Sequence, residues 1–582
     1  MAVPTAPVYG FGDFHLYAGM RLLTGCDGKP VGLMPKAYDT LAYLVEHAGA
    51  VIAKDELMRA IWPDTAVEEN NLTQNISLLR RALGEERGDR RYIATIPGRG
   101  YQFIAPVSIA PAKSAGGEPG ATASIAVLPF VNVSADPDND YFGDGLAEEI
   151  INALSKLGGV RVVARTSAFS FKGKQTDIRE IADRLGVNLV MEGSVRKSGN
   201  RLRINAQLVN AADGCHLWSE RYDREIEMHN IFDVQDEITL AVVDALKMKL
   251  ARAERSAVLK HATDNIYAHE QCLKGRFHVF RMTRSGIETG ISYFEKALDT
   301  DPSYAMAQVG LAHAYRMFGL TLEMPTEEVG PKSKAAALEA IRLDDTLGEA
   351  HAVLAFSLFW YEWAWNTSQK HFERALELDP NNAYTHWMYA HLCSNLGRHA
   401  EALAGIARAR QLDPLSGLIH AMEGQFLLHA GRTDDAIDRL REALELDSKS
   451  RVAHLFTASA YIKKGRLEEA VEEATAARSL SPSNISALAV EAYANAKLGR
   501  PAQAHGALEE CLQIRNQRYV SPYCIGLIYN GLDQPGEALT WLERALDEHD
   551  PWMAFLGVEP KWDNLRSNPP FVRLLNRLKL RS

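Results

Sequence analysis

The chain has 582 residues, of which 46% are hydrophobic and 24% are charged, so it is long enough for several globular domains and is neither a fibre nor a disordered tail. Its net charge of −10 is modest for this length, which excludes general polyanion binding over the whole surface and leaves room only for a local site. The longest uncharged apolar run, at 350–361, is shorter than the roughly 20 residues of a membrane-spanning helix, and the first residues lack a signal-peptide pattern, so we expect a cytoplasmic protein with no membrane partner.

The chemistry-bearing residue types do not form a catalytic pattern. The six cysteines are scattered without a C-x-x-C pair, which argues against a disulfide framework and a structural zinc site. The sequence also lacks a phosphate-binding loop, a dinucleotide fingerprint and histidines at metal-ligand spacing. We therefore expect no enzyme activity, no cofactor and no metal site.

Residues 1–107 predict a small domain of strands, three helices and a hairpin. Short apolar runs broken by glycine at 9–33 predict an antiparallel sheet. Helices are expected at 34–49, where Pro35 stands near the start and Gly49 past the end, then at 54–62 before Pro63, and at 68–86.

The third of these helices has two chemically distinct faces. Its apolar residues recur at spacings of four, three and four, which places one stripe against the domain core: Leu72, Ile76, Leu79 and Leu83. The opposite face carries amides and hydroxyls followed by cations: Asn70, Thr73, Gln74, Ser77 and Arg81, with Arg80 at the flank. Amide and hydroxyl groups suit base edges in a major groove, and arginines suit phosphates.

The hairpin after this helix carries a cation at its tip. Two strand-like runs, at 91–94 and 101–105, flank a turn in which Arg99 stands between Gly98 and Gly100. We interpret the glycines as letting the tip approach DNA closely, with Arg99 as a DNA contact and Tyr101 and Phe103 in the core. The alternative is that Arg99 is merely solvated.

This arrangement resembles the OmpR/PhoB-type winged-helix DNA-binding domain, on the landmarks "LMPKAYDTLAYLVEHAG", "LLRRALG" and "YIATIPGRGYQF". The resemblance implies that the third helix enters the major groove and that the hairpin, or wing, touches the adjacent minor groove or backbone. It assigns base reading to Asn70, Thr73, Gln74 and Ser77, and phosphate anchoring to Arg80, Arg81 and Thr95. The chain departs from the family in having Pro97, Ser77 and Leu78 where basic residues are common.

A linker and a mixed domain follow. Residues 108–123 are rich in Ala, Gly, Pro and Ser and predict a flexible linker. Residues 124–250 alternate strand and helix patterns, which favours an α/β domain with a mixed sheet. This stretch resembles the amino-terminal domain of TolB, and no reaction follows from that resemblance.

Residues 265–582 contain an internal repeat. The pair Gly-Arg recurs at 397, 431, 465 and 499, at intervals of 34 residues, and helices end at similar phrases such as "ALELDP". The pattern resembles the tetratricopeptide repeat and predicts eight helical hairpins in a solenoid, with a capping helix that carries Leu574, Leu575 and Leu578. Such a solenoid offers a concave groove for a protein or peptide. We assign Trp360, Trp363 and Trp365 to its core in preference to a binding cluster.

The expected fold class is thus multidomain α and α/β, with a winged helix, a small mixed α/β domain and an all-α solenoid. The first functional hypothesis is a one-component, DNA-binding transcriptional regulator. Its expected partners are double-stranded DNA, a protein or peptide in the repeat groove and, as an open alternative, a second copy of the chain. A competing hypothesis is a scaffold whose winged helix has little DNA affinity, and an enzymatic role based on the middle domain ranks last.

Overall fold

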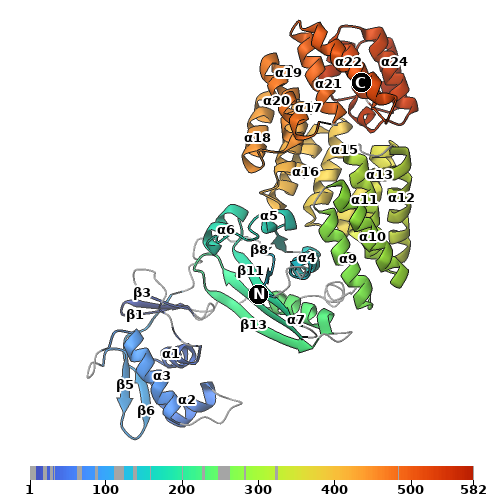
Figure 1. Cartoon of the computed structure of the whole chain (residues 1–582). Helices are drawn as coiled ribbons and strands as arrows, with labels where there is room; N and C mark the ends of the chain where they lie inside the picture. The colour runs from blue at the N-terminus through green and yellow to red at the C-terminus, as the bar shows by residue number, and fades with distance from the viewer. Residues whose placement is uncertain are drawn as a thin grey trace. The chain divides into compact units, whose positions relative to one another are not determined.

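The computed structural model describes 8–17, 22–25, 31, 33, 35–61, 69–85, 90–110, 123–134, 140–157, 159–198, 201–225, 230–246, 262–280, 283–321, 326–482 and 484–580. These residues belong to two compact units, Met1–Ala121 and Thr122–Ser582, each shown in Figure 1. None of the described helices is both long and apolar enough to cross a bilayer.

The first unit begins with an antiparallel sheet. Its strands lie in the order β3-β2-β1-β7, with β1 at Val8–Phe11, β2 at Phe14–Tyr17, β3 at Leu22–Gly25 and β7 at Ser108–Ala110. Strand β7 pairs with β1, so the first three residues of the expected linker are part of this sheet. Of the rest of that segment, 111–122 lies outside the described residues and Ala123 begins the next strand, β8.

Three helices and a second sheet complete this unit. The helices are α1 (Pro35–Glu46), α2 (Lys54–Ile61) and α3 (Glu69–Ala82). The sheet has the order β4-β6-β5, with β4 at Val51–Ala53, β5 at Ile93–Ile96 and β6 at Gly100–Phe103. Phe103 is fully buried and its ring meets Phe11 edge-on at 5.0 Å, so the hairpin β5–β6 and the first sheet share one core. This is the winged-helix order expected from the sequence.

The second unit opens with a mixed sheet, as the alternating pattern predicts. Its strands run β10-β8-β11-β12-β13, with parallel pairing from β10 to β11 and antiparallel pairing from β11 to β13, and β9 also pairs with β11. Their bounds are β8 Ala123–Val127, β9 Val131–Asn132, β10 Val160–Val162, β11 Leu189–Ser198, β12 Arg201–Asn210 and β13 His216–Glu225.

Helices cover both faces of this sheet. On one face α4 (Asp140–Ser155) and α7 (Asn230–Ala245) bury a core that includes Ile125 and Val127. On the other face α5 (Arg165–Phe169) and α6 (Ile178–Leu185) bury Ala126 and Val190. Because neighbouring residues of a strand point to opposite faces, β8 contributes to both cores.

The described residues from 266 to 547 form eight consecutive helical hairpins, as the 34-residue period predicts. Their glycine turns are left-handed at Gly397, Gly431, Gly465 and Gly499, where φ lies between +73° and +77°. The sixteen helices are α9 Ile266–Val279, α10 Arg284–Thr300, α11 Ala305–Thr321, α12 Thr326–Leu343, α13 Gly348–Tyr361, α14 Trp365–Leu378, α15 Ala383–Asn395, α16 His399–Leu412, α17 Gly417–His429, α18 Thr433–Leu446, α19 Arg451–Lys464, α20 Leu467–Leu480, α21 Ile485–Lys497, α22 Pro501–Arg515, α23 Pro522–Gly531 and α24 Pro535–Asp547.

The last residues of the chain pack back onto the first helices of several hairpins. This C-terminal segment comprises two 3₁₀ turns, η3 (Pro551–Phe555) and η4 (Pro560–Leu565), and α25 (Pro569–Arg577). The ring of Phe555 lies 5.5 Å from that of Trp360 and 5.4 Å from that of His391. Further along the solenoid, the ammonium of Lys561 donates to Ser459 of α19 at 2.9 Å. The segment therefore covers part of the surface that was expected to face a partner.

The tryptophan cluster supports this docking. Trp360 and Trp365 are both 6% exposed, in agreement with their assignment to the core. However, the indole of Trp365 donates to the carbonyl of Leu578 at 2.7 Å, so its polar atom anchors the C-terminal segment. Leu574, Leu575 and Leu578 are buried, which fits a helix that closes the solenoid.

The α/β domain and the solenoid, which the sequence suggests as separate domains at 124–250 and 265–582, pack into one compact unit. The amide of Asn381 donates to the carbonyls of Ser155 and Val160, both at 3.1 Å. The backbone N–H of Ala164 donates to the carbonyl of Leu412 at 2.8 Å. These bonds join the end of α4 and the start of α5 to the loops that connect successive hairpins.

Candidate nucleic-acid interface

Helix α3 presents one face to the core of the first unit. Leu72 and Leu79 are fully buried, and Ile76 and Leu83 are each 2% exposed. This stripe is the one that the four-three-four spacing predicts. Its burial fixes the rotation of the helix, so the opposite face must point outward.

That outward face carries most of the side chains expected to read bases. Thr73, Gln74, Ser77 and Arg81 are exposed. Asn70 belongs to α3, but its side chain lies outside the described residues. Two further side chains share this face and were not among the expected contacts, the exposed Asn71 and Leu78, which is 44% exposed. Helical spacing alone could have found both.

Arg80 occupies a different position from Arg81. Its guanidinium donates to the carbonyl of Ile93 at 2.9 Å and to the hydroxyl of Thr95 at 2.8 Å, both in β5. It also lies 3.6 Å from the carboxylate of Glu85, whose side chain is completely buried and accepts the backbone N–H groups of Tyr92 and Ile93. The structure thus brings together Arg80 and Thr95, both expected as phosphate anchors, in a network that holds β5 against α3.

The wing tip has an exposed cation on a constrained turn. Residues 97–99 form the turn, which is closed by the N–H of Arg99 donating to the carbonyl of Ile96 at 3.0 Å. The side chain of Arg99 is exposed and makes no hydrogen bond or ion pair with the described residues. It is therefore available to an outside partner.

The two glycines beside Arg99 each have a structural role in the hairpin. Gly98 adopts a left-handed φ of +69° in the turn. At Gly100 a Cβ atom would lie 1.9 Å from the carbonyl oxygen of Ile52 in β4, so only glycine allows β6 to pair there. The turn and the neighbouring strand thus require these glycines, and a close approach of the tip to DNA stays a prediction.

Further exposed cations lie near α3 and the wing. Arg90 and Arg91 are both exposed just before β5, and Arg91 donates to the carbonyl of Gly84 at 3.3 Å. From the sequence, these two arginines were expected to add positive charge, but neither was assigned a DNA contact. Amides and hydroxyls bordered by guanidinium groups can bind a phosphate backbone while hydrogen-bonding base edges.

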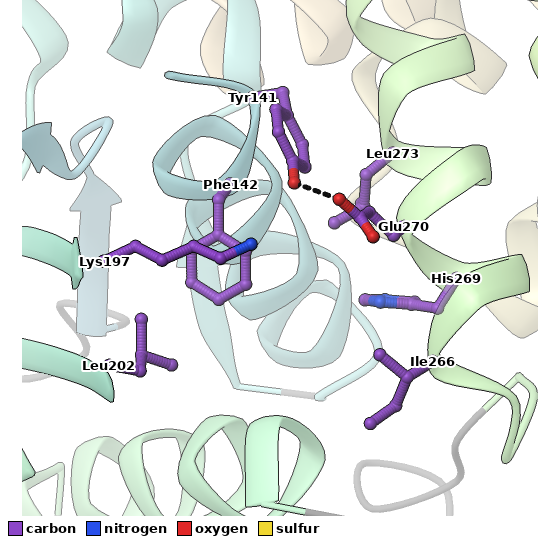
Figure 2. Close-up of a pocket in the computed structure, with 8 residues that line it drawn as sticks. All are labelled: Tyr141, Phe142, Lys197, Leu202, Ile266, His269, Glu270 and Leu273. Carbon is purple, nitrogen blue, oxygen red and sulfur yellow. Dashed lines mark hydrogen bonds between the residues drawn. The ribbon is translucent and has the colours of Figure 1, made fainter. Parts of the chain in front are cut away.

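The second unit also has a small pocket, shown in Figure 2, between α4, the β11–β12 hairpin and α9. Its volume is about 60 Å³, and Tyr141 donates there to the carboxylate of Glu270. Burial raises the pKa of Glu270, but hydrogen bonds from Tyr141 and Lys274 outweigh that effect and lower it below its usual value. A pocket of this size has room for a few water molecules and not for a metabolite.

Family comparisons identify the parts of the chain. Residues 28–103 match the family described as "Transcriptional regulatory protein, C terminal", and 121–241 match "HilA/YgeH-like transcriptional regulator, second domain". Residues 371–404 and 427–492 match tetratricopeptide repeats. The chain thus contains an OmpR/PhoB-type winged helix, a HilA-like regulator domain and tetratricopeptide repeats. The resemblance of the middle domain to TolB stays a prediction.

The similar curated proteins include transcriptional regulators and one protein that is named as an enzyme. The chain is 25% identical over 346 residues to the transcriptional regulator HilA of Salmonella typhimurium, covering 59% of this chain and 60% of that protein. It is 38% identical over 102 residues to the transcriptional activator CadC of Escherichia coli, covering 17% and 20%. It is 39% identical over 243 residues to a putative adenylate cyclase 3 of Rhizobium meliloti, covering 41% and 40%. The chain therefore spans less than two thirds of the length of these relatives.

Proposed function

We propose that this chain is a cytoplasmic, DNA-binding transcriptional regulator whose output element is α3. The observation that carries the proposal is the exposed face of that helix, on which Thr73, Gln74 and Ser77 precede Arg81. Neutral hydrogen-bonding groups followed by a cation suit a helix that enters the major groove and ends near the backbone. The match of 28–103 to a transcriptional-regulator family supports the same role.

The roles of the individual residues follow from their positions. Gln74, with Thr73, Ser77 and Asn70, reads base edges, and Arg81 and Arg99 neutralise phosphates. Arg80 and Thr95 act mainly as positioning residues, because their mutual hydrogen bond fixes the wing relative to α3. Arg90 and Arg91 add positive charge beside the same surface.

The second unit is proposed as the regulatory part of a one-component regulator, with a protein or peptide as one partner. The tetratricopeptide repeats support a protein partner in general terms. Since η3 and η4 already cover part of the first helices of the hairpins, such a partner binds the uncovered surface or displaces the C-terminal segment. Self-association is a further proposal, which light scattering of the purified chain over a range of concentrations would test.

We propose that the chain is not an enzyme. The similarity to a putative adenylate cyclase spans 41% of this chain and 40% of that protein, so it involves only part of each. Incubation of the purified chain with ATP and Mg²⁺ or Mn²⁺, followed by measurement of cyclic AMP, tests this directly. Cyclic AMP formation above a heat-inactivated control would contradict the proposal.

Selection of duplexes from a random DNA library by the full chain tests the main proposal. A regulator enriches one sequence motif, and Gln74→Ala relaxes the preference at one or two positions of that motif by about 1–3 kcal/mol per lost contact. A scaffold with an inactive winged helix enriches none. Gln369→Ala, in the solenoid helix α14, is the matched control and leaves the motif unchanged.

A further inference from the structure

A cavity of about 530 Å³ lies inside the second unit, between the α/β domain and the solenoid. Residues of α4 and α5 form one wall, and residues of α9, α11, α13, α15 and α17 contribute to the other. Small-molecule sites in proteins span roughly 300–1,000 Å³, so this cavity is large enough for a metabolite, unlike the pocket of Figure 2.

Much of the lining is apolar, and each of its carboxylates has at least one hydrogen-bond or ion-pair partner. The apolar lining residues include Val279, Phe280, Met317, Val353 and Met388. Glu148 pairs with Arg276 at 2.8 Å and with Arg165 at 3.2 Å, and Glu349 pairs with Arg276 at 2.9 Å. Asp413 accepts the N–H of Ser167 at 2.9 Å, and Asp447 accepts the N–H of Lys449 at 3.0 Å. Asp379 accepts the amide of Asn382 at 3.1 Å through Oδ2, whereas its Oδ1 is buried without a hydrogen-bond partner.

One cation beside the cavity has no counter-charge among the described residues. Arg316 of α11 is completely buried, and its Nε and Nη1 atoms have no hydrogen-bond partner. Its Cζ atom lies 5.1 Å from the ring centroids of both Phe356 and Tyr384. A guanidinium does not lose its proton in a protein, and an uncompensated buried charge is strongly unfavourable. The surroundings of Arg316 therefore favour the arrival of an anion.

His313, which contacts Arg316 and lines the cavity, has a hydrogen-bond donor. The Nη2 atom of Arg316 lies 3.2 Å from Nε2 of His313, and since a guanidinium only donates, Nε2 accepts. The proton of the neutral His313 ring is then on Nδ1. Burial, together with Arg316 and Arg276, lowers the pKa of His313 well below its usual value, which keeps the ring neutral. His313 lines the cavity, so its hydrogen bond with Arg316 connects the buried guanidinium to the surface of the cavity.

Two residues of α15 add donors on the same wall. Tyr384 lines the cavity with its ring 5.6 Å from that of His313, and Trp387 lines it with its ring 4.7 Å from that of Tyr384. The indole N–H of Trp387 is buried without a hydrogen-bond partner. A buried donor without a partner is unfavourable until an acceptor reaches it.

We propose that this cavity binds a small organic carboxylate, whose charge offsets that of Arg316 and whose carboxylate accepts hydrogen bonds from His313, Tyr384 and Trp387. A single uncompensated guanidinium matches a monoanion better than a phosphate dianion, and the apolar lining holds the rest of the molecule. Any regulatory meaning of this site rests on the proposed function, whereas binding itself does not.

Titration calorimetry of the full chain without DNA tests the proposal. The probes are benzoate, phenylacetate and octanoate, with benzamide and benzylamine as uncharged and cationic counterparts of similar shape. At least one carboxylate is expected to bind saturably, and the amide and the amine at least tenfold more weakly. Arg316→Met is expected to weaken carboxylate binding at least tenfold, whereas Arg342→Met, at an exposed arginine of α12, leaves it unchanged.

Two outcomes overturn the proposal. One is that none of the three carboxylates binds saturably to the wild-type chain, and the other is that Arg316→Met binds them as tightly as the wild type does. Should Arg316→Met fail to fold, Trp387→Phe keeps an aromatic ring and removes the indole donor, and unchanged affinity in that variant overturns the proposal equally. Because no DNA is present, either failure leaves the DNA-binding proposal untouched.

Discussion

The guanidinium of Arg80 in α3 and the hydroxyl of Thr95 in β5 are joined by a hydrogen bond of 2.8 Å. The sequence suggested both residues as phosphate anchors, yet their contact links the proposed recognition helix to the wing. We therefore expect Arg80 to affect DNA binding mainly through the geometry of the wing, and Arg81, one residue further on and exposed, to affect it directly.

Arg81→Ala and Arg80→Ala should weaken DNA binding in different ways. Arg81→Ala removes a phosphate contact, so the slope of log K against log salt falls by about one unit. Arg80→Ala leaves the buried carboxylate of Glu85 without its nearby cation and loosens β5, which should reduce affinity and accelerate amide hydrogen exchange in 90–103. Gel shifts at several salt concentrations and hydrogen-exchange mass spectrometry measure the two effects.

Arg80→Lys and Thr95→Val serve as controls for this distinction. Lysine keeps the charge but cannot reproduce the paired hydrogen bonds to Ile93 and Thr95, and valine removes the hydroxyl acceptor. If Arg80→Lys restored both affinity and exchange protection completely, a phosphate-anchoring role would be favoured over a positioning role.

Gly100→Ala should disrupt the wing far more than Gly98→Ala. At Gly100 the new methyl group would lie 1.9 Å from the carbonyl oxygen of Ile52, so β4 and β6 must separate. At Gly98 nothing lies within 4 Å and only the left-handed φ is unfavourable, at roughly 1–2 kcal/mol. Hydrogen exchange of β4 and β6 in the full chain distinguishes them. Equal protection in the two variants would show that β4 does not require the glycine.

Asp413→Asn should change the pH dependence of stability. Burial raises the pKa of Asp413 to about 6, although hydrogen bonds from Ser167 lower it. A raised folded-state pKa means that this carboxyl stabilises the fold most below its unfolded value of 3.8 and loses that contribution as the pH rises through about 6. Between pH 4 and pH 7 the free energy of unfolding of the wild type should therefore fall by on the order of 3 kcal/mol relative to that of Asp413→Asn.

Thermal unfolding of both proteins across this range, at one scan rate, measures the difference in midpoint. Asp435→Asn is the control, because Asp435 is an exposed carboxylate of α18 that pairs with Arg432. A difference between wild type and Asp413→Asn that did not depend on pH would rule out titration of Asp413 in this range.

Phe555→Ala should release the C-terminal segment from the solenoid. The ring of Phe555 is 3% exposed and packs against Trp360, His391 and His429, so its removal costs about 3–5 kcal/mol. We expect faster tryptic cleavage after Lys561 and Arg566 under native conditions. Leu480→Ala, at a side chain 42% exposed, is the control. Unchanged cleavage in Phe555→Ala would mean that this ring does not hold the segment.

The periodic parts of the architecture could be predicted from the sequence. The eight hairpins follow a repeat of 34 residues, the strands of the mixed sheet follow an alternation of two residues, and the buried stripe of α3 follows the helical period of 3.6 residues. Each of these periods can be read directly along the sequence. The exposed face of α3 could be predicted for the same reason, because burying Leu72 and Leu79 decides which residues point outward.

The structure alone shows the pairing of Arg80 with Thr95, the docking of the α/β domain and the closure of the solenoid by the C-terminal segment. The bond between Asn381 and Ser155 joins residues 226 apart, and that between Trp365 and Leu578 joins residues 213 apart. Contacts at such separations follow no short period and depend on how whole elements pack. The sequence by itself determined which elements form and which faces they bury. Only the tertiary structure decided which polar groups remain available to a partner, because a side chain that can bind a partner can also form its hydrogen bonds within the fold.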